Sequence, residues 1–410
     1  MTLGRYERRS VGREQIPGIR RVQDADVRGK AALVRVDYNV PLRDGEIADD
    51  TRIRASIPTI VTLADGGAKV VLVTHLGRPG GHVVPSLRLG PISSRLSERI
   101  GRPVVKLDDS IGDDVVTAIR EGRGGDIFLL ENVRFYPEEE SNDAAFAAAL
   151  ARPADLFVND AFGTVHRSHA STLGVAELLP SYAGLLMQRE VDVLSGLLED
   201  PARPYIAIIG GKKAGSKLGA LRDLIPRIDG ILVGGGVAFS LLYAQGAAIG
   251  DSLVEESLLD EIREILEAAA KKGVEIVLPL DVQLAQRLDA KAEVHVGDAR
   301  SIPTGWAGFD IGPKTVEAFR RWIQKAKTLV WTGPMGAFEC EPFAAGTEGV
   351  AEAIAASSAF SVIGGGETGE AVARFGYGGG VSYISTGGGA CLAMLRGKTL
   401  PALEALRSDE

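Results

Sequence analysis

The stretch Tyr205-Ile-Ala-Ile-Ile-Gly-Gly-Lys-Lys-Ala-Gly-Ser-Lys217 is the segment around which the rest of the chain can be interpreted. Its aliphatic start predicts a strand buried on both faces, and Gly210 and Gly211 predict a sharp turn with room for a ligand. Lys213 and Lys217 are four residues apart, so they would share one face of a helix. A glycine turn, a helix start and converging cations favour a phosphate site. An ordinary strand-to-helix turn with solvated lysines explains this segment alone equally well.

The composition is that of an ordinary soluble globular protein. The chain has 410 residues, of which 45% are hydrophobic and 24% charged, and its length predicts two to three domains. The net charge of -8 argues against general nucleic-acid or membrane-surface binding, but it leaves room for an anionic metabolite. The only cysteines, Cys340 and Cys391, provide neither a disulfide framework nor a zinc spacing, which favours a reducing, cytoplasmic setting.

The first 30 residues are basic and lack an apolar core segment. They therefore predict neither a signal peptide nor a membrane span, which would need roughly 18 apolar residues. We expect a surface extension here.

In the first half, aliphatic runs alternate with helix-like segments, which is typical of a parallel α/β sheet. Polar residues follow four of these runs, and ligands bind at the carboxyl ends of parallel strands. We expect these polar side chains to share one rim: Asp37, Asn39, His75, Arg78, Arg134 and Arg167. Arg52, at the start of the first crossover helix, is a further candidate for this rim.

Several guanidinium groups on one rim indicate a small polyanion, because arginine binds phosphate or carboxylate through two parallel hydrogen bonds. A single arginine at a strand end is more often a solvated charge, so the recurrence carries this prediction. Other classes fit less well. The chain lacks a G-x-S-x-G nucleophile elbow, and 210–217 lacks the Gly-Lys-Ser/Thr ending of a strict Walker A loop.

In the second half, residues 183–201 predict a helix, and we place the link between two lobes there. Beyond it, glycine clusters follow five predicted strands, which indicates a backbone-lined groove suited to a nucleotide. Glu339 and Glu367 supply carboxylates of the kind that hold Mg²⁺. A dinucleotide-binding Rossmann domain is the competing interpretation, but Gly-x-Gly-x-x-Gly is missing after the first strand. One glycine-rich and one arginine-rich lobe suit a nucleotide and a phosphorylated acid, with transfer between them.

Several ordered motifs make the chain resemble the phosphoglycerate kinase family from about Val27 to the C-terminus. These motifs include Val34-Arg-Val-Asp-Tyr-Asn-Val-Pro-Leu42, Asp49-Asp-Thr-Arg-Ile-Arg54, His75-Leu-Gly-Arg-Pro79, Glu131-Asn-Val-Arg-Phe135, Asp310-Ile-Gly-Pro-Lys-Thr315, Trp331-Thr-Gly-Pro-Met-Gly-Ala-Phe-Glu339 and Ser385-Thr-Gly-Gly-Gly-Ala390. Another is Asn159-Asp-Ala-Phe-Gly-Thr-Val-His-Arg-Ser-His-Ala-Ser171.

The resemblance implies an α/β fold of two similar-sized lobes, each a parallel sheet with helices on both faces, joined by a hinge helix. The expected divisions are a basic extension (1–26), a phosphoglycerate-binding lobe (27–182), the interdomain helix and hinge (183–204), a nucleotide-binding lobe (205–390) and a C-terminal segment packing back on the first lobe (391–410).

The resemblance also implies an activity. The family carries out Mg²⁺-dependent, reversible phosphoryl transfer from 1,3-bisphosphoglycerate to ADP, which gives 3-phosphoglycerate and ATP. It further implies small-molecule substrates, no nucleic-acid or membrane partner, a monomer and hinge closure during turnover.

Site residues are carried over position by position. The phosphoglycerate side comprises Asp37, Asn39, Arg52, His75, Arg78, Arg134 and Arg167. The nucleotide side comprises Gly211, Lys213, Lys217, Gly236, Thr332, Pro334, Glu339, Gly365, Gly366, Glu367 and Thr368. The resemblance assigns catalysis to Arg52 and Lys213, which would embrace the phosphoryl group in flight, and Mg²⁺ binding to Glu367.

Departures from the family pattern fall on the nucleotide side. Glu367 stands where the family has an Asp, Thr332 replaces an Asn, Lys212 replaces a small residue and Ser216 replaces an Asp. Two hypotheses follow. One is an active kinase with a retuned nucleotide or metal preference. The alternative is a relative that binds phosphoglycerate but transfers weakly, or that phosphorylates a related acid.

Overall fold

The computed structural model describes residues 18–407, and its contacts divide them into two compact units. The N-terminal unit comprises 18–193 together with 399–407, and the C-terminal unit comprises 194–398. The division falls inside helix α6 (Leu185–Glu199), so this helix belongs partly to each unit. Most of the predicted basic extension, 1–17, lies outside the described residues.

The aliphatic runs of the N-terminal unit form a six-stranded parallel sheet in the order β5-β6-β4-β1-β7-β8. Its strands are β1 (Ala31–Arg35), β4 (Lys69–Val73), β5 (Val104–Lys106), β6 (Ile127–Leu129), β7 (Leu156–Asn159) and β8 (Ser181–Ala183). A short hairpin, β2 (Leu42–Arg43) and β3 (Glu46–Ile47), follows β1. Because all six strands run the same way, the loops after β1, β4, β6 and β7 emerge at one edge.

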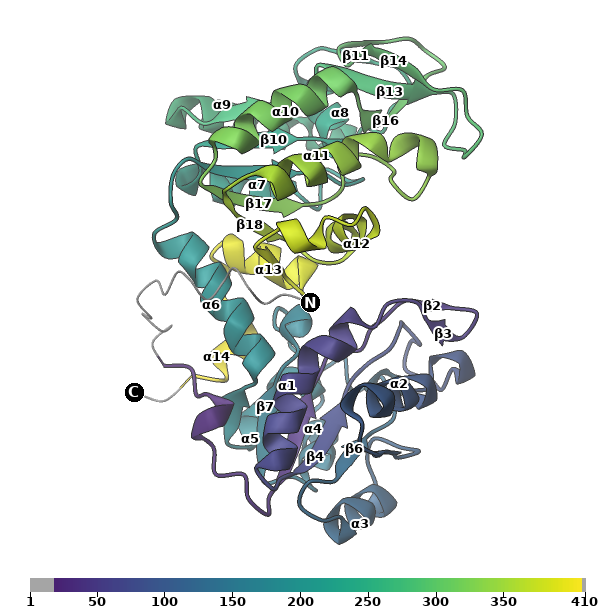
Figure 1. The fold of residues 1–410 in the computed structure, drawn as a ribbon, viewed down its shortest axis with the longest axis vertical. Coiled ribbons are helices and arrows are strands. Elements are labelled where there is room, and N and C mark those ends of the chain that lie inside the picture. Colours follow the sequence, from purple (N-terminus) through teal and green to yellow (C-terminus); the bar gives the residue numbers. More distant parts are fainter. Residues whose placement is uncertain (1–17, 408–410) are drawn as a thin grey trace. The chain divides into compact units, whose positions relative to one another are not determined.

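Helices cover both faces of this sheet, because neighbouring residues of a strand point to opposite faces. Val34 belongs to a core with α1 (Thr51–Asp65) and α2 (Gly90–Ile100). Leu33 belongs to the opposite core, with α3 (Asp113–Glu121), α4 (Ala144–Ala151) and α5 (Val175–Leu178). The unit is therefore a three-layer α/β sandwich (Figure 1).

The C-terminal unit contains a second six-stranded parallel sheet, in the order β12-β10-β9-β17-β18-β19. Its strands are β9 (Tyr205–Ile209), β10 (Gly230–Val233), β12 (Glu275–Val277), β17 (Thr328–Thr332), β18 (Phe360–Ile363) and β19 (Tyr383–Ile384). The central strand β9 is the aliphatic run with which the sequence analysis began, and all five of its residues are buried.

One helical layer of this unit consists of α10 (Pro313–Lys325) and α11 (Ala345–Ala356), which pack with Ile206, Ile208 and Trp331 in a single core. Figure 1 shows these two helices side by side along the sheet. Four further helices form a second group: α7 (Leu218–Leu224), α8 (Gly235–Ala244), α9 (Leu259–Lys272) and α13 (Gly388–Leu395). Helix α9 contacts both α7 and α8, and α7 also contacts α13. Helix α12 (Glu367–Arg374) follows β18 and contacts α11.

A small antiparallel sheet in the C-terminal unit was not predicted. Its order is β14-β13-β16, formed by β13 (Asp281–Ala285), β14 (His295–Asp298) and β16 (Ala307–Ile311). A two-stranded parallel pair, β11 (Ala248–Ile249) and β15 (Ser301–Ile302), accompanies it. Most residues of β14 are exposed, so this strand lacks the aliphatic run that marks a buried strand.

The chain returns to the N-terminal unit near its end. Ile19 pairs with Arg407, and the Ala402 amide donates to the Val165 carbonyl at 3.3 Å. Helix α14 (Pro401–Glu404) lies in this segment. Residues 391–398, expected to pack on the first lobe, instead belong to the C-terminal unit, where Arg396 forms an ion pair with Asp223 at 2.6 Å. None of the helices within 18–407 is long and apolar enough to cross a membrane.

Candidate active site

The rim of the N-terminal unit is held together by a hydrogen-bonded cluster. A guanidinium nitrogen of Arg52 on α1 donates to the Asp37 carboxylate at 2.9 Å and to the Asn39 carbonyl at 3.2 Å. The Asn39 side chain accepts from the Gly77 amide at 2.8 Å. The loops after β1 and β4 are thus fixed to each other and to the start of α1, as expected for a shared rim.

Arg134 joins this cluster from the segment after β6. It donates to the Gly77 carbonyl at 2.8 Å and pairs with Glu140 at 3.2 Å, while its side chain is only 5% exposed. Its buried Nε has no partner within the described residues. Arg134 therefore has an unused donor for an anion or water.

Arg78 and Arg167 complete the cationic group. Arg78 is exposed, and Arg167 is half-buried with its Nε donating to His166 at 3.4 Å. Burial lowers the pKa of Arg134, and the neighbouring Arg167 and Arg78 lower it further, against the opposing effect of Glu140. Mutual repulsion of this kind is relieved when a polyanion binds between the cations.

His75, like Arg134, is a buried member of the predicted set, at 3% exposed. Its Nδ1 lies 3.1 Å from a guanidinium nitrogen of Arg35, the last residue of β1. Burial, and then Arg35 and Arg134, hold the pKa of His75 well below its usual range. Arg35 was included in the sequence analysis only within the motif 34–42 and was given no role. A charged residue at the end of a buried aliphatic strand is the signal that could have singled it out.

The rim of the C-terminal unit is made of backbone. The Gly211 amide donates to the Pro334 carbonyl at 2.8 Å, and the Gly235 amide donates to the Met335 carbonyl at 2.9 Å. A side chain at Gly236 would collide with the Lys212 carbonyl, and one at Gly365 would collide with the Ser385 carbonyl. The loops after β9, β10, β17, β18 and β19 therefore pack main chain to main chain, which only glycine allows.

Two helices begin at this rim with residues of the predicted set. Gly365 and Gly366 lead into α12, whose first residues are Glu367 and Thr368. The Thr368 hydroxyl accepts a hydrogen bond from the Gly333 amide at 2.7 Å, so it ties two loops together. Gly236 is the second residue of α8. Helix N-termini of this kind favour phosphate groups.

The lysines of this rim differ from the prediction. Helix α7 begins only at Leu218, so Lys213 and Lys217 do not share a helix face, and that interpretation was wrong. Residues 214–217 form a turn instead, with the Lys217 amide donating to the Ala214 carbonyl at 2.7 Å. The Gly215 amide in this turn donates to Glu255 at 3.0 Å.

The two lysines also occupy different environments. Lys213 is exposed. Lys217 is half-buried, and its ammonium donates to the Thr332 hydroxyl at 3.2 Å. Burial lowers the pKa of Lys217, and the nearby Glu367 opposes that change. Lys217, Thr332 and Glu367 are therefore brought together, whereas Glu339 lies exposed on the loop after β17.

A buried carboxyl that was not predicted supports this rim. Asp310 in β16 is 2% exposed and accepts from the Gly346 amide at 2.6 Å and the Ile311 amide at 2.9 Å. Side chains at Gly336 and Gly346 would collide with it. Burial raises the pKa of Asp310 to about 8. Asp310 thereby anchors the segment that carries Glu339.

The carboxylate of Glu367 is the candidate metal ligand at this rim. Within 18–407, no group of three or more His, Cys, Asp or Glu side chains could hold a metal ion. Glu367 is exposed at the start of α12 and acts electrostatically on Lys217. One protein carboxylate completed by substrate phosphates and water is the arrangement typical of Mg²⁺, so the residues present fit that ion.

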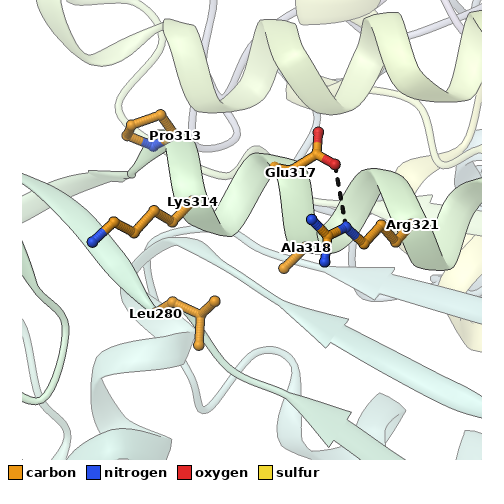
Figure 2. Close-up of a pocket in the computed structure, with 6 residues that line it drawn as sticks. All are labelled: Leu280, Pro313, Lys314, Glu317, Ala318 and Arg321. Carbon is orange, nitrogen blue, oxygen red and sulfur yellow. Dashed lines mark hydrogen bonds and ion pairs between the residues drawn. The ribbon is translucent and has the colours of Figure 1, made fainter.

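A surface pocket elsewhere in the C-terminal unit contains none of the predicted site residues. Figure 2 shows it beside α10, where Arg321 pairs with Glu317 at 3.2 Å. Lys314 and Leu280 line the other part. This i,i+4 ion pair is an ordinary solvated contact, so the pocket carries no functional assignment.

Comparisons with known proteins identify the family of this chain. The sequence profile described as "Phosphoglycerate kinase" matches residues 22–398. The phosphoglycerate kinase of Rubrobacter xylanophilus is 50% identical over 391 residues, which covers 95% of this chain and 99% of the relative. The solved phosphoglycerate kinase of Coxiella burnetii is 37% identical with a TM-score of 0.82, and that of Pyrococcus horikoshii is 34% identical with a TM-score of 0.86. Each solved structure covers 95% of this chain and is itself covered to 98%.

The fold and these similarities define a phosphotransferase built from two α/β units. The predicted fold class is confirmed. The chain belongs to the phosphoglycerate kinase family.

Proposed function

We propose that this chain catalyses Mg²⁺-dependent, reversible phosphoryl transfer from 1,3-bisphosphoglycerate to ADP, giving 3-phosphoglycerate and ATP. The single observation that carries the proposal is the converging cationic rim of the N-terminal unit, where Arg52, Arg134 and His75 are pre-positioned by hydrogen bonds. The weak-transfer alternative is not favoured, because the family's named relatives reach 50% identity over nearly their whole length.

The N-terminal rim is proposed to bind the phosphorylated acid. Arg78, Arg134 and Arg167 would bind its phosphate and carboxylate oxygens, since guanidinium groups match both anions in geometry. Asp37 would accept a hydrogen bond from the hydroxyl of the glycerate, and Asn39 would accept or donate one. Asp37 also holds Arg52 in place.

The C-terminal rim is proposed to bind the nucleotide. Backbone amides at Gly236, Gly365 and Gly366 and the start of α12 would bind phosphates. Gly211, whose amide already donates to the Pro334 carbonyl, would leave room for the phosphates to approach the backbone. Lys217 and Thr332 are already joined by a hydrogen bond and would meet the same phosphate chain. Pro334 and Glu339, on the loop after β17, would contact the nucleoside, and Thr368 would keep that loop against α12.

In the direction of ATP use, a carboxylate oxygen of 3-phosphoglycerate attacks the γ-phosphorus while the bond to the ADP oxygen breaks. Such transfer depends on positioning and charge stabilisation rather than on a covalent nucleophile. We assign that stabilisation to Arg52 and Lys213, which would both contact the phosphoryl group in the substrate-bound state. Glu367 would hold Mg²⁺, and when bound the ion neutralises charge on the nucleotide phosphates.

Steady-state turnover with 3-phosphoglycerate and Mg-ATP, followed as ADP formation, tests the proposal. We expect Arg52→Ala and Lys213→Ala each to lower kcat by about 1000-fold, the order of loss for a cation that meets the transferring phosphoryl group. Matched controls are Arg54→Ala on the same helix and Lys212→Ala beside Lys213, both exposed, and both should stay within about threefold of the parent. Absence of turnover in the parent chain, despite binding of 3-phosphoglycerate by calorimetry, would overturn the proposed function.

The metal assignment has its own test. If Glu367 holds Mg²⁺, then Glu367→Gln should raise the Mg²⁺ concentration needed for half-maximal turnover by about tenfold or more. Glu370→Gln, an exposed glutamate on the same helix, is the control. Glu367→Asp separates the two hypotheses for the altered nucleotide side. A gain in rate of tens of fold would favour weak native transfer, and little change would favour an active, retuned kinase.

The monomeric state and cytoplasmic location stay predictions. Sedimentation velocity over a range of concentrations and fractionation of the source cells would test them separately.

A further inference from the structure

A buried arginine stands behind the rim of the N-terminal unit. Arg35 closes strand β1, and the whole residue is 1% exposed. Its guanidinium donates from Nε to the Ser171 hydroxyl at 2.8 Å and from a terminal nitrogen to the Val36 carbonyl. The other terminal nitrogen lies 3.1 Å from Nδ1 of His75. All three nitrogens of this side chain therefore have partners.

A buried carboxylate balances the charge of Arg35. Glu139 is fully buried and accepts from the Ser171 amide at 2.9 Å and the Ser171 hydroxyl at 2.6 Å. Ser171 thus connects the guanidinium to the carboxylate. Burial lowers the pKa of Arg35, and Glu139 raises it again. The guanidinium stays charged, because an arginine side chain does not lose its proton in proteins.

The contact with Arg35 determines which ring nitrogen of His75 carries the proton. An arginine nitrogen can only donate, so Nδ1 of His75 must offer its lone pair. The ring proton of neutral His75 then lies on Nε2. Protonation of Nδ1 would set one N–H against another, so the charged imidazolium would lose its hydrogen bond with Arg35 and is unfavourable.

The charged groups around His75 also disfavour protonation of its ring. The charged groups that act on it are Arg35 from β1, Arg52 from α1, Arg134 from the segment after β6 and Arg167 from the segment after β7. The carboxylates nearby, Asp37 and Glu139, are already engaged with Arg52 and with Ser171. No carboxylate therefore compensates a positive charge on the ring.

We propose that Arg35 is a positioning residue that holds His75 as the neutral tautomer with its proton on Nε2. His75 then gives the phosphorylated acid a hydrogen-bond donor without adding a further charge to the arginine cluster. The part concerning the substrate rests on the proposed function, whereas the tautomer itself does not. The consequence is that this donor stays available across physiological pH, where an ordinary histidine would change charge.

The tautomer can be measured directly by NMR without substrate or turnover. The chain has five histidines, so ¹⁵N-histidine labelling of the full chain gives a resolvable spectrum, and His75→Gln assigns the His75 signals. We expect one neutral ring with its proton on Nε2 and no titration between about pH 5.5 and pH 8. A His75 ring that carries its proton on Nδ1, or that titrates near pH 6.5, overturns the proposal.

Substitution of Arg35 should release the ring. In Arg35→Met, His75 should populate both tautomers, and the pKa of its ring should rise relative to the parent, while burial and the remaining arginines still hold it below the usual range. Because this change leaves Glu139 buried without its cation, the double variant Arg35→Met with Glu139→Gln provides a version without the unpaired charge. Arg35→Lys keeps a charged donor and should preserve the neutral ring. Arg88→Met, which removes an arginine paired with the buried Glu131, is the matched control and should leave His75 unchanged.

Kinetics then connects the tautomer to the substrate. At about pH 8 the double variant should raise KM for 3-phosphoglycerate by about twofold, because only about half of the neutral rings would still carry the proton on Nε2, with KM for ATP unchanged. As the pH falls through the pKa of the released ring, the protonated ring regains an N–H on Nε2, so KM should return toward the parent value. An equal rise in both KM values with no recovery would indicate a structural role only. An unchanged tautomer in both variants would contradict the assignment to Arg35, whatever the activity.

Discussion

The two units build their candidate anion sites, each at the edge of a parallel sheet, from different parts of the chain. The N-terminal rim uses side chains, and buried ionic groups behind it, such as Arg35 with Glu139, hold these side chains in place. The C-terminal rim uses main-chain groups, and the close approach of glycine loops such as those at Gly236 and Gly365 shapes it.

This difference has a consequence for specificity. Charged side chains recognise the arrangement of oxygens on a small acid, whereas amides and helix N-termini recognise phosphate groups of any nucleotide. The comparison predicts that the N-terminal unit loses stability when a buried charge loses its partner. It predicts that the C-terminal unit loses stability when a closely packed glycine gains a side chain.

Glu131→Ala should produce the largest loss of stability, about 3 to 5 kcal/mol, because breaking a buried ion pair leaves its partners uncompensated. The Glu131 carboxylate is 4% exposed and accepts from Arg88 at 3.0 Å and from the Leu89 amide at 3.0 Å, and it also pairs with Lys106. Urea unfolding followed by circular dichroism measures the loss. KM for 3-phosphoglycerate should rise as well, since the adjacent Asn132 side chain donates to the Leu76 carbonyl at 2.8 Å.

Glu98→Ala is the control for this change. Glu98 is 68% exposed and pairs with Arg95 at 3.4 Å, so its loss should cost less than about 1 kcal/mol. Equal effects of the two substitutions would remove the distinction between buried and surface charge in this unit.

Gly365→Ala should destabilise the C-terminal unit by about 3 kcal/mol, because its new methyl group would meet the Ser385 carbonyl, which cannot move without its strand. All three tryptophans, Trp306, Trp322 and Trp331, belong to this unit, so tryptophan fluorescence during urea unfolding reports it. KM for ATP should rise while KM for 3-phosphoglycerate stays constant. Gly379→Ala, which has open space around it, should change neither quantity.

Asp310 and Asp160 should make stability fall as the pH rises. Burial raises the pKa of Asp310 to about 8 and that of Asp160 to about 7, compared with an ordinary value of 3.8. Between these values the unfolded chain has already released the protons that the folded state still binds. The free energy of unfolding contributed by these groups is therefore highest near pH 4 and is lost as the pH rises to about 8.

Substitution of each aspartate by asparagine identifies which carboxyl group causes this pH dependence. In Asp310→Asn, the decline measured by tryptophan fluorescence should become shallower. In Asp160→Asn, the fluorescence decline should persist, because Asp160 lies in the N-terminal unit, where it accepts from the Leu186 amide at 3.0 Å. A decline of unchanged slope in Asp310→Asn would show that other groups cause it.

Thr332→Asn should give the smallest effect, a decrease of about two- to fivefold in KM for ATP. Asparagine keeps an oxygen acceptor for Lys217, which now donates to the Thr332 hydroxyl at 3.2 Å, and adds an amide donor toward phosphate. Initial rates with ATP and with other nucleoside triphosphates measure the change. A loss of activity would mean that the threonine is needed for this chain's own loop geometry.

The sequence was sufficient to predict most of both parallel sheets, because strands buried on two faces appear as aliphatic runs. It did not predict β14, which is largely exposed, or the short edge strands β5 and β8. Exposed and very short strands depend on their neighbours for stability, so their composition carries little signal.

The side chains of the candidate rims could be predicted for a similar reason, since polar residues directly follow buried strands. The residues behind the rims could not be predicted, because their contacts come from distant parts of the chain. Arg35 and its partner Ser171 are separated by 136 positions. The glycine clusters were predicted to leave room for a ligand, but the structure shows in addition that the loops themselves approach closely. The lysine pair was misplaced because α7 begins only at Leu218, after the segment that carries both lysines.

The return of residues 399–407 to the N-terminal unit has a consequence for synthesis on the ribosome. The C-terminal unit is one continuous segment, 194–398, so all of it emerges before the last pieces of the N-terminal unit. Those pieces include the buried side chains of Leu400, Leu403 and Leu406. The unit that is translated first is therefore completed last. A nascent chain halted after residue 398 would carry a complete C-terminal unit, but its N-terminal unit would expose the apolar residues that 399–407 later cover. Chaperones and proteases would distinguish this species from the full-length product.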